Sequence, residues 1–518
     1  MTNYTWLPHL DGAVPPAGQG KRISTYTVAL EAWRRGIRLR FYSTFDEENK
    51  LKLRYALKHD EKEHHFALSK GDEVTEEAFD ICEDKQLTRE YLEEAGVAVP
   101  KGAKFADGTT EDEIIRFAES IGYPVVLKPV SANGGKGVFA NVKDEEVLRG
   151  AIQYVRDELE YKDVIIEEHI PWEREFRIIV IGDRVLGAMH RIPANVQGDG
   201  VQTIKQLIEE KNKFRKQNPH LTNRTIRIDK EVLYMIEQAG YTLDSVLEEG
   251  KTLYLRVQSN LSNGGDSVDM TEELSPGLEQ MALDATKAIP GLAQSGVDIM
   301  VDDHGEQGVV VEVNSRPGLG GHLFPMHGTP RDFAKAFIDY YFPETADYHR
   351  SNLYFNFDAI LEPLKARSAS MVEVARAPAG KMYARKFIVK GDVQGIGYRQ
   401  HIKREALNNQ FHGFAKNEAD GSVSVVVTGE DEEQVEAFRE ICAEGPENAN
   451  VHEVQVEPWT KPLCIGFKSL SVKKKTLTKK DYERMARHYL MMQKSTSWKI
   501  TAPIRKAMDV VKKIKRKQ

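Results

Sequence analysis

Cysteine is scarce in this chain, and long apolar runs are missing. The 518 residues include only Cys82, Cys442 and Cys464, which lie too far apart for a disulfide framework or a cysteine-rich zinc site. The longest apolar stretches, such as residues 176–181, have the length of a strand and fall far short of a membrane span. The first residues do not place a basic segment before an apolar one, as a secretory signal does. We therefore expect a cytoplasmic protein.

Negative charge prevails except in the last part of the chain. The chain has 72 Lys and Arg against 79 Asp and Glu, a formal net charge of −7. Residues 471–518 carry 16 basic and 3 acidic side chains, so the first 470 residues carry −20. Two amphipathic helical patterns in this tail predict contact with an anionic membrane or polymer, or docking on the acidic body of the protein. Nucleic acid is not expected as a partner, because the aromatic side chains do not form a stacking surface.

Length and composition predict several domains. At about 150 residues per domain, three or four are expected, and 41% hydrophobic residues suffice for several cores. The expected elements suggest a small α/β region at 1–80, an α+β domain at 81–345 and a linker at 346–383. Residues 384–470 follow the order βαββαβ, which predicts an antiparallel sheet with two helices on one face. Residues 471–518 are the basic helical tail.

Two lysines and a glycine-rich loop lie in the central region. Lys128 ends an apolar strand, where it can hold an ammonium group against phosphate oxygens, and Lys85 opens another element. The loop 131–137 (SANGGKG) can fold over a triphosphate, because glycine leaves backbone N–H groups unshielded and tolerates positive φ. Each feature alone is more often a solvated strand end or an ordinary turn. Their occurrence together favours a nucleotide site.

An acidic cluster follows further along the chain. Asp298 lies on one of two paired strands, and Glu312 and Asn314 lie on the other. Glu312 and Asn314 are two residues apart on a strand and point the same way. Such oxygen ligands suit a Mg²⁺ ion that also binds phosphates. Turn capping is the alternative role for such side chains at strand ends.

The central region resembles the ATP-grasp superfamily. The resemblance covers about residues 80–345 and is strongest to the ligase module of cyanophycin synthetase and of fused glutamate–cysteine ligase/glutathione synthetase enzymes. It rests on the segments DKQLTREYLEEAGVAVP, YPVVLKPVSANGGKGV, EFRIIVIGDRVLGAMHRIPANVQGDGVQTIKQLI, LRVQSNLSNGGDSVDMT and EVNSRPGLGGHLFP. The fold that it implies is an ATP-grasp fold with two α+β lobes. The larger ligase domains of those relatives are absent from this sequence.

The resemblance implies a role for each matching residue. The nucleotide phosphates would be bound by Lys85, Lys128, Gly134, Gly135, Lys136 and Gly137. Adenine would be bound by the backbone of Glu167, Glu168, His169 and Ile170, and the ribose by Glu175. The metal, Mg²⁺ or alternatively Mn²⁺, would be held by Asp298, Glu312 and Asn314. The catalytic arginines would be Arg191 and Arg256, for which surface ion pairs are the alternative.

The chemistry implied by the resemblance has two steps. A substrate carboxylate attacks the γ-phosphate of ATP and gives an acyl phosphate, and an amine then displaces phosphate. Cations and N–H donors supply most of the catalysis, because charge is spread over the transferring oxygens. No covalent nucleophile from the protein is required.

Residues 384–470 resemble acylphosphatase over their whole length, through VKGDVQGIGYR and GFAKNEADGSV. Gly391, Gly395 and Gly397 allow successive backbone N–H groups to converge on one phosphate. Arg399 closes the loop with a planar fork for two phosphate oxygens. The resemblance implies Arg399 and Asn417 as catalytic residues, with Asn417 orienting the attacking water. A tight strand–helix turn and a strand cap are the alternative interpretations.

Taken together, these patterns predict an α+β multidomain enzyme: an ATP-grasp carboxylate–amine ligase fused to an acylphosphatase. We expect it in the cytoplasm, with peripheral membrane contact through the tail and self-association into a homo-oligomer as further expectations. Three alternatives remain open. The ATP-grasp half could only sense nucleotide beside an acylphosphatase, the ligase could extend an anionic polymer at a membrane, or the chain could be a non-enzymatic scaffold.

Overall fold

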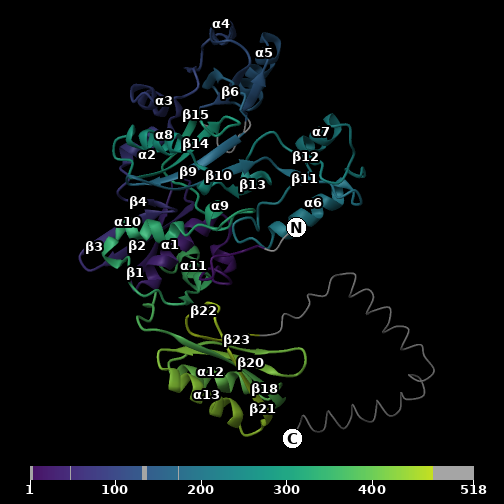
Figure 1. Cartoon of the computed structure of the whole chain (residues 1–518). Helices are drawn as coiled ribbons and strands as arrows, with labels where there is room; N and C mark the ends of the chain where they lie inside the picture. The colour runs from purple at the N-terminus through teal and green to yellow at the C-terminus, as the bar shows by residue number, and fades with distance from the viewer. Residues whose placement is uncertain (1–3, 47, 131–136, 173, 471–518) are drawn as a thin grey trace, which may run out of the picture.

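The computed structural model describes residues 4–46, 48–130, 137–172 and 174–470. The predicted loop residues Gly134, Gly135 and Lys136 and the basic tail therefore lie outside the described residues. Figure 1 shows the units stacked along one long axis, with the lobe of α4 and α5 at one end and the unit of α12 and α13 at the other. Among the described residues, no helix is long and apolar enough to cross a membrane.

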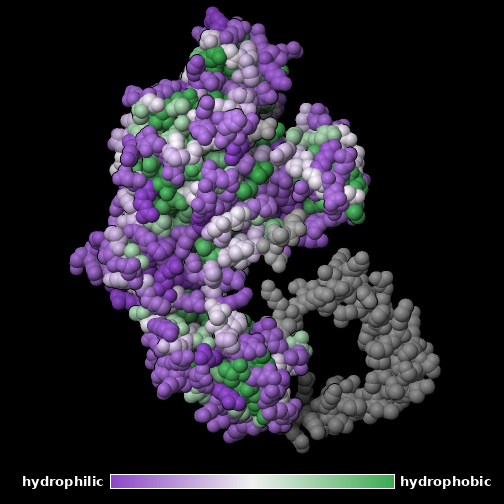
Figure 2. All heavy atoms as spheres, in the orientation of Figure 1, coloured by the Kyte–Doolittle hydropathy of each residue, from purple (hydrophilic) through white to green (hydrophobic). Residues whose placement is uncertain are grey.

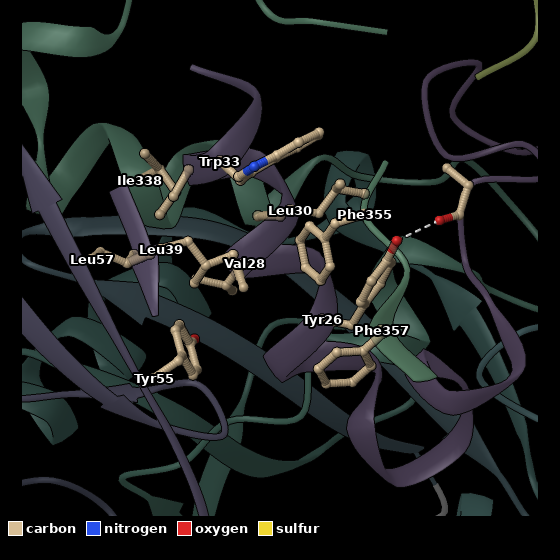
Figure 3. Packing of buried hydrophobic residues seen from close by; sticks show 14 of the residues in the cluster. Tyr26, Val28, Leu30, Trp33, Leu39, Tyr55, Leu57, Ile338, Phe355 and Phe357 are labelled. Carbon is tan, nitrogen blue, oxygen red and sulfur yellow. Dashed lines mark hydrogen bonds between the residues drawn. The ribbon is translucent and has the colours of Figure 1, made fainter. Parts of the chain in front are cut away.

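The unit in the middle of the stack is built on a five-stranded sheet in the order β17-β1-β2-β3-β4. Its strands are β1 (Arg38–Phe45), β2 (Leu51–His59), β3 (Lys62–Ala67), β4 (Lys70–Gly71) and β17 (Met371–Glu373). It shares one core with α1 (Ile23–Arg34), α10 (Phe333–Tyr341) and α11 (Phe357–Lys365). Aromatic rings fill this core: Tyr26 lies 5.1 Å from Phe355 and 5.3 Å from Phe357, and its hydroxyl donates to the Ala13 carbonyl at 2.8 Å (Figure 3).

Residues 346–383, expected to form a linker, contribute to this core. They contain α11 and β17, and β17 pairs with β1 through Phe41 and Val372. Phe357, Leu361 and Leu364 of α11 are buried, because their spacing places them on one face of the helix. The segment completes the sheet of the N-terminal region.

The next two sheets form the candidate nucleotide-binding lobes. One is four-stranded in the order β5-β8-β6-β7, with β5 (Gly102–Phe105), β6 (Val125–Pro129), β7 (Phe139–Val142) and β8 (Val164–Glu168), and it packs on α4 (Glu111–Ile121) and α5 (Glu145–Gln153). The other is five-stranded in the order β13-β10-β9-β14-β15. Its strands are β9 (Arg174–Ile181), β10 (Arg184–Ile192), β13 (Asp266–Asp269), β14 (Gln294–Val301) and β15 (Gly308–Asn314). The predicted Gly182–Asp183 turn joins β9 to β10.

Helices flank the second of these sheets. One face packs on α8 (Pro276–Lys287) and α2 (Glu76–Glu83), and α3 (Lys85–Glu94) follows α2 directly. The short α9 (Gly320–Leu323) lies against β10 and β13. A small lobe of α6 (Ile204–Arg215), α7 (Lys230–Gln238), β11 (Asn195–Gln197) and β12 (Thr252–Tyr254) projects to the side (Figure 1). It has its own apolar core.

The C-terminal unit confirms the predicted βαββαβ order. Its sheet has the order β21-β18-β20-β19-β23, with β18 (Tyr383–Asp392), β19 (His412–Asn417), β20 (Val423–Gly429), β21 (Asn450–Pro458) and β23 (Phe467–Leu470). Helices α12 (Tyr398–Asn408) and α13 (Glu432–Glu444) pack on the sheet around Phe387, Val425 and Phe438. Alternation along β20 sends Val426 to the opposite face, where it joins the core of the middle unit.

A short parallel ladder fixes the C-terminal unit to the middle unit. β16 (Leu353–Tyr354) pairs with β22 (Leu463–Cys464), and Lys461 forms an ion pair with Asp11 at 3.1 Å. Figure 2 shows the C-terminal unit as a distinct lobe at one end of the body. The C-terminal unit is therefore attached directly to the middle unit.

Candidate active sites

The two predicted lysines meet in one pocket between the lobes. Asp84 caps α3 by accepting from the N–H groups of Gln86 and Leu87, which makes Lys85 the first residue of that helix. Lys128 on β6 donates to Glu167 on the neighbouring strand β8, with Nζ and Oε1 2.6 Å apart. The charged residues that line the pocket are Lys85, Arg89, Lys128, Glu167 and Glu312. The pocket therefore combines residues from both sheets and from α3.

Cationic and anionic side chains lie close together in this pocket. Burial lowers the pKa of Lys85, and nearby Lys128 lowers it further, while the carboxylates of Glu312 and Glu167 oppose the shift. Two ammonium groups held near each other and near two carboxylates form a site that anionic oxygens would stabilise. Apolar walls, including Leu92, Ile165 and Val313, complete the pocket. This combination suits a nucleotide, which has both a charged and a flat apolar part.

The predicted acidic residues lie on the polar face of the larger sheet. Asp298 on β14 stands opposite Glu312 on β15 and opposite Arg177 on β9. Asp298 is 1% exposed, and it accepts from Arg177 Nη2 at 2.5 Å and from Arg191 Nη2 at 2.9 Å. Burial acts to raise the pKa of Asp298, but the two guanidinium groups outweigh it and lower the pKa to about 2. The carboxylate therefore stays ionised at neutral pH.

Glu175 and Arg191 extend this polar network, and Arg256 does not join it. Glu175 pairs with Arg191 and accepts from the Ser259 hydroxyl. Arg256 is buried in the side lobe region, where it binds Asp229 at 2.5 Å and also pairs with Glu231. Of the two predicted arginines, one thus lies beside the acidic cluster and the other is engaged by carboxylates around α7.

The residues present fit a divalent cation. Glu312 and Asn314 share one face of β15, and Asp298 lies opposite Glu312. The donors that would hold such an ion are the carboxylates of Asp298 and Glu312 and the carboxamide oxygen of Asn314. The Asn314 Nδ2 atom, which no cation would bind, is buried and has no hydrogen-bond partner within the described part of the chain. No group of three or more His, Cys, Asp or Glu suitable for a metal occurs in residues 4–470 apart from the gaps given above, because the third predicted ligand is an asparagine. Mg²⁺ bound there would neutralise phosphate oxygens.

The predicted adenine-binding segment ends β8. The Glu168 N–H donates to the Lys101 carbonyl at 2.8 Å, and the His169 N–H donates to the Pro124 carbonyl at 3.1 Å. Glu167 directs its side chain to Lys128, as described above, and Ile170 follows the strand in a partly buried position. Gly137, at the end of the predicted phosphate loop, has φ +71°, and a Cβ there would lie 2.9 Å from the Pro129 ring.

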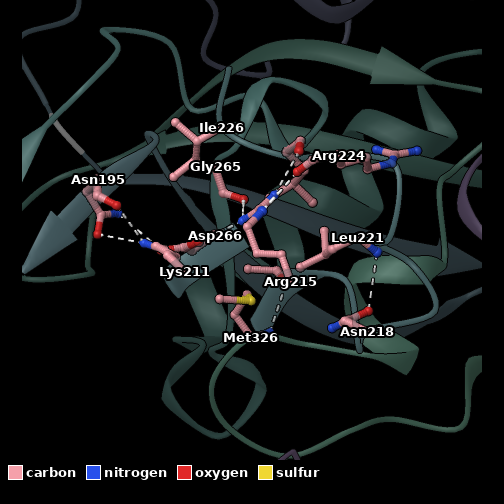
Figure 4. A network of polar contacts seen from close by, with 12 residues as sticks. Asn195, Lys211, Arg215, Asn218, Leu221, Arg224, Ile226, Gly265, Asp266 and Met326 are labelled. Atoms are coloured by element: carbon pink, nitrogen blue, oxygen red, sulfur yellow. Dashed lines mark hydrogen bonds and ion pairs between the residues drawn. The ribbon is translucent and has the colours of Figure 1, made fainter. Parts of the chain in front are cut away.

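Sequence reasoning missed a buried ion cluster beside the acidic face. Lys211 donates to Asp266 at 2.6 Å, and Arg215 donates to the other Asp266 oxygen at 2.9 Å and to the Gly265 carbonyl at 2.9 Å (Figure 4). Arg215 is fully buried. The cluster anchors α6 to the start of β13 and therefore fixes the SNGGD segment. The signal in the sequence was the i, i+4 spacing of the two cations on a helix otherwise expected to be solvated.

Two histidines were also missed. His220 and His322 are 5% and 2% exposed, and neither ring has a hydrogen-bond partner in the described residues. Burial, together with nearby Arg177 and Arg191, lowers the pKa of His322 to about 3. His322 also stacks on Phe333 with ring centroids 4.6 Å apart. Both imidazoles are neutral at physiological pH.

The second site lies at one end of the C-terminal sheet. Gly395 and Gly397 have φ +81° and +84°, which turns the chain from β18 into α12, and Gly397 caps that helix. Arg399 lies in its first turn and donates to the Leu470 carbonyl. Leu470 pairs with Lys416, the neighbour of Asn417, on β19. Arg399, Asn417 and the glycine loop are therefore brought to the same edge.

Asn417 has the environment of a ligand-binding amide. It is the last residue of β19 and pairs with Val423 across the hairpin. Its Oδ1 atom is buried and has no hydrogen-bond partner among the described residues. A buried acceptor without a partner costs about 1–3 kcal/mol. A bound water would remove this cost and would lie beside the loop that is proposed to hold phosphate.

Three family models match separate parts of the chain. Residues 84–193 match the carbamoyl-phosphate synthase L chain, ATP binding domain; residues 241–330 match the RimK-like ATP-grasp domain; and residues 385–468 match acylphosphatase. These matches overlap the two sites described above.

Curated relatives and solved structures cover the ATP-grasp part. Cyanophycin synthetase from Synechocystis sp. is 33% identical over 267 residues, 50% of this chain and 30% of that protein. The glutathione biosynthesis bifunctional protein GshAB from Listeria innocua is 35% identical over 277 residues, 51% of this chain and 34% of that protein. A bifunctional glutathione synthetase structure from Pasteurella multocida has 28% identity and a TM-score of 0.44, covering 59% of this chain and 42% of that one. The chain thus spans about a third of the length of these curated relatives, and it joins an ATP-grasp region to a C-terminal acylphosphatase domain.

Proposed function

We propose that the ATP-grasp region is an ATP- and Mg²⁺-dependent ligase that joins a carboxylate to an amine through an acyl phosphate. The observation that carries this proposal is the pocket between the lobes, where Lys85, Lys128, Glu167 and Glu312 converge from four elements. The similarity to cyanophycin synthetase and to GshAB supports it.

In the proposed mechanism, Lys85 and Lys128 bind the phosphate oxygens of ATP. A carboxylate oxygen of the substrate attacks the γ-phosphorus, the bond to the β-phosphate oxygen breaks, and ADP leaves. The amine nitrogen then attacks the acyl carbon, the bond from that carbon to the phosphate oxygen breaks, and the nitrogen loses a proton. Arg177 and Arg191, held by Asp298, place positive charge beside the transferring group.

The C-terminal domain is proposed to hydrolyse acyl phosphates. The glycine loop and Arg399 would bind the phosphoryl oxygens, and the unpartnered Asn417 Oδ1 would accept a hydrogen bond from the attacking water. Water adds to phosphorus and loses a proton, the bond between phosphorus and the acyl oxygen breaks, and a carboxylate and inorganic phosphate are released. Positioning and charge stabilisation suffice for this chemistry.

The two sites belong to units at opposite ends of the stack. In Figure 1, α3 and β6 lie in the end opposite to β18 and α12, with the sheet of β1–β4 between them. An acyl phosphate formed in the first site must therefore pass through solvent to reach the second. We propose that the acylphosphatase domain removes acyl phosphates that escape from the ligase site.

A screen for ADP release tests the ligase proposal. Amino acids, dipeptides and cell-wall fragments are offered as carboxylates and amines with ATP and Mg²⁺. We expect turnover that is lost in Lys128→Ala and kept in Lys104→Ala, a lysine of the same lobe whose side chain is 31% exposed and lies 3.8 Å from Asp163. Calorimetry in which the wild type takes up no ATP with Mg²⁺ would contradict the proposal.

A mixture of two variants, each of which lacks one of the two proposed activities, tests whether the acyl phosphate passes through solvent. Lys128→Ala lacks the first activity and Arg399→Ala the second. If the acyl phosphate is released to solvent, the mixture liberates inorganic phosphate from ATP and the carboxylate as fast as the wild type at equal site concentrations. If the mixture liberates phosphate more slowly than the wild type, the acyl phosphate is transferred directly between the two sites of one chain. Turnover of ATP by Arg399→Ala also separates this proposal from a nucleotide-sensing acylphosphatase.

The tail and self-association are proposed separately. The 16 basic side chains of residues 471–518 support contact with an anionic membrane or polymer, and therefore peripheral attachment. Co-sedimentation with vesicles containing anionic lipid is expected for the full chain and not after deletion of the tail. Sedimentation velocity of the full chain checks the proposed homo-oligomer.

A further inference from the structure

Gln394 lies in the middle of the glycine loop and contacts the hairpin that carries Asn417. Its Nε2 atom donates to two backbone carbonyl oxygens, that of Glu418 at 2.9 Å and that of Ser422 at 2.8 Å. Glu418 directly follows Asn417, and Ser422 directly precedes Val423, the residue paired with Asn417. One side chain therefore contacts both ends of the turn that follows Asn417.

The rest of the loop explains why Gln394 faces this turn. Val393 is 1% exposed and belongs to the core of the domain, so the loop is anchored to the core beside it. Gly395 is exposed and has open space where a Cβ would be. The side chain between them is directed to the β19–β20 turn, away from the cradle formed by the backbone.

The turn itself is already closed by other bonds. The Glu418 N–H donates to the Ser422 carbonyl at 2.8 Å, and Asp420 accepts from the Ser422 hydroxyl at 2.7 Å. These bonds give the hairpin its shape without Gln394. What Gln394 adds is the position of the hairpin relative to the phosphate loop.

We propose that Gln394 is a positioning residue that fixes the Asn417 amide relative to the phosphate bound by the glycine loop. The inference rests on the proposed acylphosphatase activity. Hydrolysis needs the water held by Asn417 to lie in line with the phosphorus, and a misplacement of about 1 Å costs about 100-fold in rate. Phosphate binding depends on the backbone and on Arg399, so it does not require the two bonds of Gln394.

The test uses the full chain, benzoyl phosphate as substrate and inorganic phosphate as competitive inhibitor. Gln394→Glu keeps the size of the side chain and replaces its N–H donors by oxygens that repel the two carbonyls. Gln394→Ala removes the side chain. Gln410→Glu makes the same chemical change at an exposed position beyond α12 and serves as the control. Circular dichroism verifies that each variant is folded.

We expect kcat to fall about 10- to 100-fold in Gln394→Glu and in Gln394→Ala. The inhibition constant for phosphate should stay within about threefold of the wild type in Gln394→Ala, which adds no charge to the loop, and Gln410→Glu should keep wild-type kcat. Adding Gln394→Glu to Asn417→Ala should cause little further loss, because the effect of Gln394 passes through Asn417.

Four results would overturn the inference: wild-type kcat in Gln394→Ala, a phosphate inhibition constant that rises in Gln394→Ala in step with the loss of kcat, losses that multiply in the double variant, or wild-type kcat in Asn417→Ala. The first three leave the acylphosphatase proposal intact. A wild-type chain that does not hydrolyse benzoyl phosphate removes that proposal, and this inference with it.

Discussion

Replacing Asp298 by asparagine removes the charge that binds both Arg177 and Arg191, two partly buried guanidinium groups. Arg177 and Arg191 both donate to its carboxylate. The lowering of its pKa from 3.8 to about 2 corresponds to a few kcal/mol in favour of the ionised form, at about 1.4 kcal/mol per unit. Breaking a buried ion pair from one side typically costs about 3–5 kcal/mol. We therefore expect Asp298→Asn to lower the free energy of unfolding by about 2–5 kcal/mol at pH 7.

The sign of the pH dependence follows from the lowered pKa. A carboxyl group with a lower pKa in the folded state stabilises the protein above its unfolded pKa, and this contribution is lost as the pH falls through the folded pKa. With values of 3.8 and about 2, the contribution is complete at pH 7, about half remains at pH 3, and it is gone below about pH 2. The difference in the free energy of unfolding between the wild type and Asp298→Asn should therefore shrink as the pH falls from 7 to 3.

Urea unfolding followed by circular dichroism measures this difference at pH 7 and at pH 3. Asp303→Asn, in the exposed turn after β14, is the matched control and should change stability by less than about 0.5 kcal/mol. Hydrolysis of benzoyl phosphate, followed in the same urea series, reports on the C-terminal unit and should be unaffected. A loss below about 1 kcal/mol in Asp298→Asn at pH 7, or a loss independent of pH, would refute the reasoning.

Three further outcomes follow from the two sites. Lys128→Ala should weaken binding of ATP with Mg²⁺ at least about tenfold in calorimetry, because it removes one of two ammonium groups and leaves Glu167 unpaired; unchanged affinity would place the nucleotide elsewhere. Asp266→Asn should destabilise the chain by about 3–5 kcal/mol in urea unfolding, because Lys211 and Arg215 lose their buried counter-charge; a neutral effect would show that water compensates. Arg399→Ala should lose inhibition by phosphate, whereas Asn417→Ala should keep it and lose kcat; equal effects of both on phosphate binding would contradict the assigned roles.

Local sequence patterns correctly predicted those elements that depend only on residues close together in the sequence. The βαββαβ order, the hairpin at Gly182 and the paired strands of Asp298 and Glu312 depend on alternation and on turn residues, and the structure confirms them. The same reasoning failed for residues 346–383, whose weak periodicity and two prolines suggested a linker. Their partner, strand β1, lies more than 300 residues earlier. No local pattern indicates so distant a pairing.

In the candidate sites too, local motifs could be recognised in the sequence, whereas contacts between distant segments could not. Motifs located Lys85, Lys128, Glu312, Arg399 and the glycine loop, because each motif is a continuous segment. Their partners come from other segments: the counter-charges of Asp298 are on β9 and β10, and the anchor of the SNGGD segment is on α6. Arg256 illustrates the limit, since its motif says nothing of the carboxylates around α7 that bind it.

The way in which the two activities are joined constrains how they can cooperate. A flexible linker would let one site visit the other, at an effective concentration of order millimolar for a short linker. Here the β16–β22 ladder and the shared core around Val426 attach the acylphosphatase domain to the middle unit, and its loop lies in the unit farthest from the ligase pocket (Figure 1). Fusion then keeps the sites of the two proposed activities in equal number, and it would give little kinetic advantage to an acyl phosphate made by the same chain. The domain would act on acyl phosphates in the surrounding solution whatever their source, which is why the mixture of Lys128→Ala and Arg399→Ala is expected to match the wild type.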